Sequence, residues 1–202
     1  MALYDRYLAA RLRLSEASLP THVALVITER DLLEPGAYDT LQSFFGWAFE
    51  YGADRVTAAV SVLDPGAIPT LQRAMEDLDA PREMAVRGPD DSEPADAPIN
   101  VAIGLGGRAE FADAVRDIAE RVDAGELDPE EIDESHVEES LVFREAPDLV
   151  IKTGAERLSD FMIWQSVYSE LYFTDVNWRD FRKRDYLRAL RDFQERQRRF
   201  GR

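Results

Sequence analysis

The sequence contains no cysteine, which excludes disulfides, thiolate metal sites and a thiol nucleophile in one step. No apolar run is long enough to cross a bilayer, and the first twenty residues lack the charged, apolar and small-residue zones of a signal peptide. The 202 residues suffice for one sizeable core and give no sign of a second one. We therefore expect a soluble, cytoplasmic, single-domain protein.

Lysine is also scarce, because Lys152 and Lys183 are the only two in a chain of formal net charge -16. Many carboxylates with few lysines fit either a surface that stays hydrated at high salt, as in a halophilic cytosol, or an ordinary acidic protein, and they argue against nucleic acid as a partner. The cations gather in residues 179–202, which predicts a basic C-terminal helix. Two interpretations are open: contact with a lipid surface, a diphosphate or an acidic partner, or ion pairs within the helix.

Short apolar runs alternate with helical patterns, which predicts an α/β fold with a central, mainly parallel six-stranded sheet flanked by helices. The expected strands are 22–28, 55–62, 82–87, 99–105, 148–151 and 171–175, and the main expected helices are 1–14, 38–51, 68–78, 109–122 and 161–168. Helical spacing predicts two apolar faces, made of Phe111, Val115, Ile118 and Val122 in one helix and of Phe161, Trp164, Val167 and Tyr168 in another.

A polar loop, residues 152–159, follows the strand at 148–151 and begins with Lys152, Thr153 and Gly154. Open α/β sheets bind ligands at the carboxyl ends of their strands. A loop there that offers cations, hydroxyls and backbone N–H groups suits an anion. The sequence therefore predicts a phosphate-binding loop.

The segment 147–181, PDLVIKTGAERLSDFMIWQSVYSELYFTDVNWRDF, resembles the C-terminal signature of the cis-prenyltransferases, the undecaprenyl and dehydrodolichyl diphosphate synthase family. The resemblance implies the fold of that family over residues 1–202, with 1–20 as an N-terminal helix and linker and 179–202 as a basic helix and tail. It also implies isoprenoid diphosphates as ligands and magnesium as the cofactor of an active site.

The resemblance also assigns roles to individual residues. It implies that a diphosphate would be bound by Lys152, Gly154, Arg157, Ser159 and the arginine of a Gly-Gly-Arg turn, Arg108. Glu170 matches a glutamate of the magnesium site, and a structural or interface role for it stays open. Arg199 and Gly201 match an Arg-x-Gly tail that the family passes across its dimer interface into the neighbouring active site.

The chain departs from the family pattern at the end of its first strand. Where the family has the aspartate of an Asp-Gly-Asn turn, this chain has Thr28, followed by Glu29 and Arg30. The Gly-His element and the Asn-Trp-x-Arg-Pro motif of the family are absent too, and the helix at 68–78 is much shorter. A hydroxyl cannot supply the anionic oxygen that magnesium prefers.

These departures lead to one hypothesis and two alternatives. The hypothesis is a catalytically deficient subunit that forms a dimer with an active cis-prenyltransferase paralogue. The first alternative is a divergent active synthase, which could itself form a dimer, with Glu29, Asp31 and Glu170 around magnesium. The second is a protein that binds isoprenoid diphosphates or anionic lipid, at the membrane periphery, without turnover.

Overall fold

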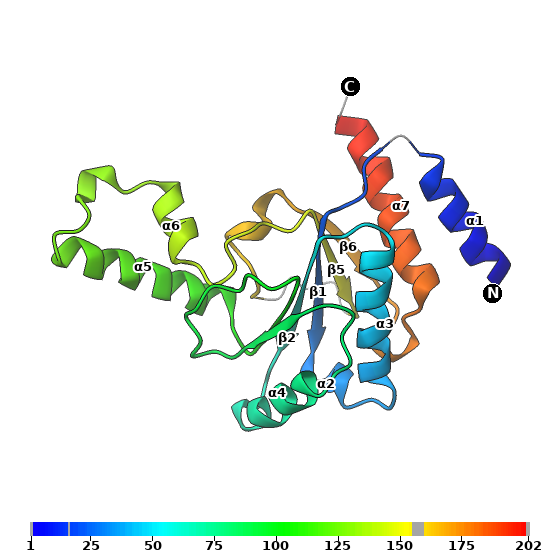
Figure 1. Ribbon diagram of the computed structural model, residues 1–202, viewed down its shortest axis with the longest axis horizontal. Coiled ribbons are helices and arrows are strands. Elements are labelled where there is room, and N and C mark those ends of the chain that lie inside the picture. The colour runs from blue at the N-terminus through cyan, green and yellow to red at the C-terminus, as the bar shows by residue number, and fades with distance from the viewer. Residues whose placement is uncertain (1, 16, 155–159, 201–202) are drawn as a thin grey trace.

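The computed structural model describes residues 2–15, 17–154 and 160–200, with backbone only at 2–5, 13 and 197–200 (Figure 1). Its centre is a six-stranded sheet in the order β3-β4-β2-β1-β5-β6, and all five strand pairs are parallel. The strands are β1 His22–Thr28, β2 Arg55–Ser61, β3 Met84–Arg87, β4 Ile99–Ile103, β5 Leu149–Thr153 and β6 Glu170–Thr174. The predicted α/β architecture is confirmed.

Seven α-helices and four short 3₁₀ turns connect the strands within the described residues. The helices are α1 Ala2–Arg13, α2 Glu29–Leu32, α3 Ala37–Glu50, α4 Ile68–Glu76, α5 Gly107–Asp123, α6 Glu134–Ser140 and α7 Lys183–Phe200. The 3₁₀ turns are η1 Pro65–Ala67, η2 Pro129–Glu131, η3 Gln165–Tyr168 and η4 Trp178–Asp180. A search of the described helices finds no segment with the length and apolarity needed to span a membrane.

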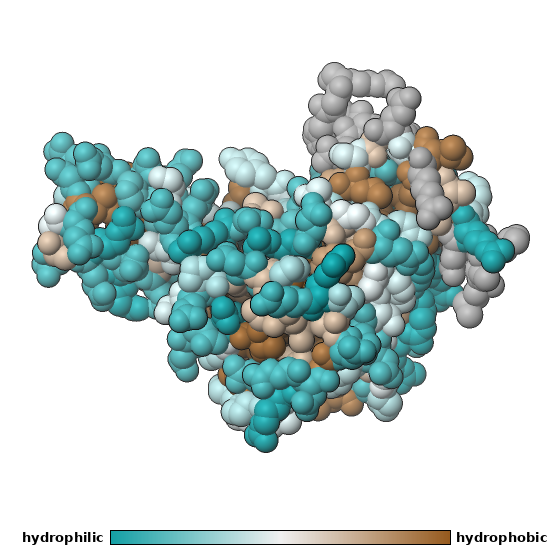
Figure 2. Space-filling model, viewed as in Figure 1, coloured by the Kyte–Doolittle hydropathy of each residue, from teal (hydrophilic) through white to brown (hydrophobic). Residues whose placement is uncertain are grey.

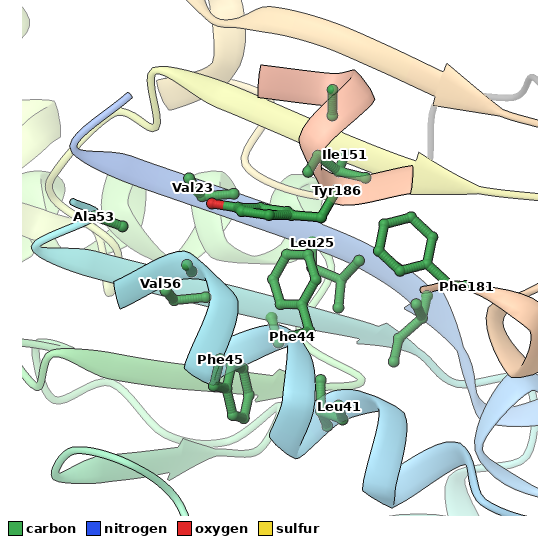
Figure 3. Close-up of a cluster of buried hydrophobic side chains, with 14 of the residues drawn as sticks. Val23, Leu25, Leu41, Phe44, Phe45, Ala53, Val56, Ile151, Phe181 and Tyr186 are labelled. Atoms are coloured by element: carbon green, nitrogen blue, oxygen red, sulfur yellow. The ribbon is translucent and has the colours of Figure 1, made fainter. Parts of the chain in front are cut away.

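The first face of the sheet carries the main core, under α3, α4 and α7. Strands covered on both faces read as continuous apolar runs, and alternate residues of β1 and β5 point to this side. Figure 3 shows side chains of α3 directed at those of the strands, with Tyr186 and Phe181 beside them. The residues of this core that Figure 3 labels are Val23, Leu25, Leu41, Phe44, Phe45, Ala53, Val56, Ile151, Phe181 and Tyr186.

The second face has a smaller apolar core, which irregular segments around Phe143 and Phe161 cover in place of full helices. It also holds buried polar groups at the amino ends of the strands. The Nδ1 atom of His22 lies 3.2 Å from the carbonyl oxygen of Ala146, so Nε2 accepts from the Thr57 hydroxyl at 2.9 Å. Burial, and then the charge of Arg55, lower the pKa of His22 to about 4.

Helix α5 runs away from the sheet, and α6 folds back beside it, so the two helices form an arm at one end of the molecule (Figure 1). We call residues 107–140 the acidic arm, because they contain thirteen acidic and three basic residues, a net charge of -10. Figure 2 shows this arm as mostly hydrophilic. The basic helix α7 lies at the other end, and several of its arginines form ion pairs inside the helix, such as Arg196 with Asp192 at 2.9 Å.

The predicted helix at 161–168 is wrong. Met162 has a φ of 47°, the only positive φ of a non-glycine residue in the described part of the chain, and only η3 is helical. Phe161 is buried, whereas the Val167 and Tyr168 side chains are 66% and 97% exposed. The physical reason is tertiary: the segment turns so that the side chain of Gln165 is buried against α5.

The predicted inward face of α5 is also largely wrong. Its buried positions are Gly107, Glu110, Ala114 and Ile118. Of the four residues predicted to face inward, only Ile118 does so, and Val115 is 47% exposed. A helix that leaves the sheet has no core beneath most of its length, so an apolar stripe on it can stay at the surface.

Candidate functional site

Lys152 lies at the carboxyl edge of the sheet and belongs to the second face. It pairs with Val26 of β1 and lines a small hollow together with Phe161 and Ser166. The next residue, Thr153, points to the first face, where it is buried and its hydroxyl has no partner among the described residues. Lys152 is therefore the cation that β5 presents on the side of residues 160–166.

Gly154 continues the sheet before the loop begins. Its backbone has a φ of +76°, a conformation that favours glycine, and its N–H donates to the carbonyl oxygen of Thr174 at 3.1 Å. This N–H is therefore bonded within the sheet, and the role of Gly154 is to let the backbone turn out of β5 into the loop. The predicted diphosphate residues Arg157 and Ser159 lie outside the described residues, as do Gly201 and the side chain of Arg199.

Arg108 lies in the first turn of α5, and its side chain is exposed to solvent. The two N–H groups that open this helix are already bound: Gly107 N donates to the Asp160 carbonyl oxygen at 2.8 Å, and Arg108 N donates to Asp160 Oδ1 at 2.9 Å. The exposed guanidinium group of Arg108 is therefore the cation that this turn offers to an anion.

A buried network that the sequence did not predict ties α5 to the segment after the loop. Glu110 accepts from Phe143 N at 2.9 Å, and Gln165 Nε2 lies 3.4 Å from both Glu110 carboxylate oxygens. Gln165 also donates to the carbonyl oxygen of Phe143 at 2.6 Å. Burial raises the pKa of Glu110, and the hydrogen bonds oppose that shift. The sequence offered one signal for this network: Glu110 follows the Gly106–Gly107 pair by one helical turn and lies on the same face of α5 as Ala114.

The end of β1 is closed by local hydrogen bonds. Thr28 caps helix α2 in a capping box, in which Asp31 Oδ2 accepts from Thr28 N at 2.8 Å and from Thr28 Oγ1 at 2.7 Å. Glu29 Oε2 accepts from the backbone N–H groups of Leu63 at 3.0 Å and Asp64 at 3.2 Å. Asp31 is thus committed to the cap of α2, and Glu29 joins the end of β1 to the residues that follow β2.

Glu170 lies at the amino end of β6, whereas Thr28 lies at the carboxyl end of β1. Glu170 pairs with Leu149, which in turn pairs with Val23 of β1. Thr28 lies five residues beyond Val23, so Glu170 and Thr28 are about 16 Å apart along the strand direction. Glu170 also forms an ion pair with Arg196 at 3.2 Å. No group of three or more acidic or histidine side chains that could hold a metal ion occurs among the described residues. The residues present in one chain therefore do not fit a magnesium site built from Glu29, Asp31 and Glu170.

Comparison with known proteins finds a family profile, curated relatives and solved structures that are similar to this chain. A family profile described as "Putative undecaprenyl diphosphate synthase" matches residues 68–201. The tritrans,polycis-undecaprenyl-diphosphate synthase (geranylgeranyl-diphosphate specific) of Methanopyrus kandleri is 56% identical over 107 residues, which are 52% of this chain and 40% of that protein. An isoprenyl transferase of Thermus thermophilus is 47% identical over 111 residues, 52% of this chain and 42% of its own length. The matched region thus spans less than half of these relatives.

Solved structures share the fold over most of the chain. Lavandulyl diphosphate synthase from Lavandula x intermedia superposes with a TM-score of 0.72 at 24% identity, covering 87% of this chain and 95% of that one. A probable undecaprenyl diphosphate synthase from Campylobacter jejuni gives 0.66 at 22% identity, covering 92% and 100%. With this fold, the profile match and the signature at 147–181, the chain belongs to the undecaprenyl diphosphate synthase family of prenyltransferases.

Proposed function

We propose that this protein is a diphosphate-binding subunit of a polyprenyl diphosphate synthase, one that lacks a metal site of its own and supports an active paralogue. The observation that carries the proposal is the end of β1, where a threonine-capped helix stands in place of a carboxylate turn. Lys152 on the second face and the exposed Arg108 in the first turn of α5 supply the cations for the diphosphate. Magnesium would then be held in the partner's site.

The capped helix supports the loss of metal binding for an electrostatic reason. Magnesium binds through anionic oxygens in near-octahedral geometry, and a threonine hydroxyl contributes no charge. Glu29 and Asp31 are the nearby carboxylates, but each accepts two hydrogen bonds through one of its oxygens. Drawing either one toward a metal would break these bonds and leave backbone N–H groups without an acceptor.

An exposed apolar surface supports a partner. Val115, Ile163, Val167 and Tyr168 are between 41% and 97% exposed. They belong to α5 and to residues 163–168, two segments that meet where Phe111 stacks on Trp164, with ring centroids 5.7 Å apart, and where Ile163 lies against Gly107. We call these four exposed residues the apolar surface. Several exposed apolar groups on two segments in contact are typical of a protein interface.

The charge of the neighbouring arm favours a paralogue over a second copy. In a two-fold symmetric dimer the same surface meets itself, so the acidic arms, each with a net charge of -10, would lie near one another. Like charges repel at low ionic strength, and salt weakens the repulsion. A paralogue with fewer carboxylates on the matching helix would avoid this repulsion.

An active synthase is the second candidate, favoured by the 56% identity to a relative that is named as a synthase. The two candidates differ in one assay. The purified chain is supplied with magnesium, isopentenyl diphosphate and either farnesyl or geranylgeranyl diphosphate, and chain elongation is measured with and without a co-purified paralogue. We expect no elongation by this chain alone and activation of the paralogue. Elongation by the chain alone would overturn the subunit proposal.

Two variants test how the subunit acts on its partner. Arg199→Ala should abolish activation if the tail enters the partner's site, and association should persist. Val115→Asp places a charge on the apolar surface and should weaken association at least tenfold. Leu14→Asp is the matched control, because Leu14 is 85% exposed at the end of α1, far from the arm. Diphosphate binding without turnover, association or activation would instead favour a binding protein.

A further inference from the structure

The chain that follows the predicted phosphate loop packs closely on the start of α5. A Cβ atom on Gly107 would lie 3.0 Å from the backbone nitrogens of Met162 and Ile163. A Cβ atom on Gly106 would lie 3.1 Å from Asp160 Oδ2. Such contacts are tighter than most real ones, so a side chain on Gly107 would push the backbone of residues 162–163 away, and one on Gly106 would displace the Asp160 carboxylate. The two glycines therefore permit residues 160–163 to lie against the helix.

Asp160 holds the first turn of this helix through two hydrogen bonds. Its carbonyl oxygen accepts from Gly107 N at 2.8 Å, and its Oδ1 accepts from Arg108 N at 2.9 Å. The first N–H groups of a helix have no partner inside the helix, and a carboxylate near them is favoured by the helix dipole. Asp160 thus fixes the backbone of Arg108 from outside the helix.

The buried Glu110–Gln165 network attaches the same segment to α5 at a second place. Glu110 and Gln165 are 4% and 5% exposed, and they meet at the backbone of Phe143. Residues 160–165 are therefore joined to α5 at both ends, by Asp160 at the first turn and by Gln165 one turn further on.

Arg108 is the exposed cation of the turn that Asp160 holds. We propose that Asp160 is a positioning residue of the diphosphate site, which sets the place of the Arg108 guanidinium and does not itself contact the ligand. This inference rests on the proposed function, because it takes Arg108 as a diphosphate ligand. It adds that Asp160, which directly follows the predicted phosphate loop, affects diphosphate binding through helix α5.

The test measures binding of inorganic diphosphate to the full chain by isothermal titration calorimetry. Arg108→Ala should lower the affinity about tenfold, because a charge-assisted hydrogen bond is lost. Asp160→Ala should lower it about fivefold, because the first turn loses an acceptor. Asp160→Asn should stay within about twofold of the wild type, because the amide oxygen still accepts from Arg108 N.

A double-mutant cycle separates positioning from a general structural effect. If Asp160 acts through Arg108, then Asp160→Ala causes no further loss in an Arg108→Ala background. Fully additive losses would overturn the inference. Asp117→Ala is the control, since it removes a 2.7 Å bond from Ser140 further along α5 and should leave the affinity unchanged.

The possible failures are distinguishable. If the wild type does not bind diphosphate, this inference and the diphosphate part of the proposed function fail together. If Arg108→Ala loses affinity while Asp160→Ala keeps it, only the positioning role fails. If the wild type binds and Arg108→Ala has no effect, the inference fails and Lys152 remains the proposed ligand.

Discussion

The two faces of the sheet are built differently. The first face is sealed by helices over an apolar core that includes Trp178, Phe44 and Tyr186, all essentially without solvent exposure. The second face is covered by irregular segments, contains buried polar groups such as Glu110 and Gln165, and leads into the apolar surface. We infer that the first face supplies most of the folding free energy and that the second face supplies the contacts with ligand and partner.

The sharpest test of this division compares two tryptophans, one from each side. Trp178 is fully buried on the first face, and its Nε1–H donates to the Ala37 carbonyl oxygen at 3.1 Å. Trp178→Ala should lower the free energy of unfolding by about 4 kcal/mol. Trp164 is half-buried on the other side, where it stacks on Phe111, and Trp164→Ala should cost about 1 kcal/mol. Urea denaturation measures both, and equal losses would contradict the division.

The second prediction concerns pH and the polar groups of the second face. The folded chain does not protonate His22 until its pKa of about 4, whereas the unfolded chain takes up this proton near 6.5. The contribution of His22 to stability is therefore complete above pH 6.5 and is lost as the pH falls toward 4. Between pH 7 and pH 5 this loss is about 2 kcal/mol.

The check is His22→Gln, which removes the titrating group. Urea denaturation of the variant and the wild type at pH 7 and pH 5 should show a smaller loss of stability in the variant. If both chains lose the same amount, the pH dependence comes from other groups.

The third prediction separates stability from binding at the carboxyl edge. Glu29→Ala leaves the N–H groups of Leu63 and Asp64 without their acceptor and should cost about 1 kcal/mol of stability. It should leave the affinity for diphosphate unchanged, because Glu29 acts only between strand ends. Arg108→Ala should do the reverse. Thermal denaturation and calorimetry with diphosphate test the two variants. A loss of diphosphate affinity in Glu29→Ala would mean that Glu29 belongs to the diphosphate site.

The smallest effect is expected on the apolar surface. Tyr168 is 97% exposed, so Tyr168→Ser should change the free energy of unfolding by less than about 0.5 kcal/mol. If a partner covers this surface, the same variant should still weaken association, which analytical ultracentrifugation with the paralogue measures. A large loss of stability in the isolated chain would mean that Tyr168 belongs to the core of the monomer.

Much of the architecture could be predicted because it depends on local patterns. The continuous apolar runs of β1, β2 and β4 indicated strands buried on both faces, and Pro and Gly marked their ends. The signature at 147–181 predicted the family. The same segment also predicted where Lys152 would lie, because a residue at the end of a parallel strand must lie at the carboxyl edge of the sheet.

The errors arose where tertiary contacts override local spacing. Residues 161–168 have a helical pattern, but packing on Gly107 and the burial of Gln165 hold Met162 in a left-handed conformation. In the acidic stretch from Asp128, proline in the first turn predicts the start of a short helix, but only the 3₁₀ turn η2 forms there and α6 begins at Glu134. Spacing in α5 identified an apolar stripe correctly, but spacing cannot distinguish a stripe that meets the core from one at the surface.

The position of the acidic arm relative to α7 gives the molecule a large electric dipole moment along its longest axis. The arm carries a net charge of -10 at one end, and α7, with seven basic and three acidic residues, lies at the other. A cationic protein that diffuses toward this molecule would be turned toward the arm, and hence toward Val115 on its helix α5, before any contact forms. The rate of encounter with such a protein should therefore fall steeply as ionic strength rises.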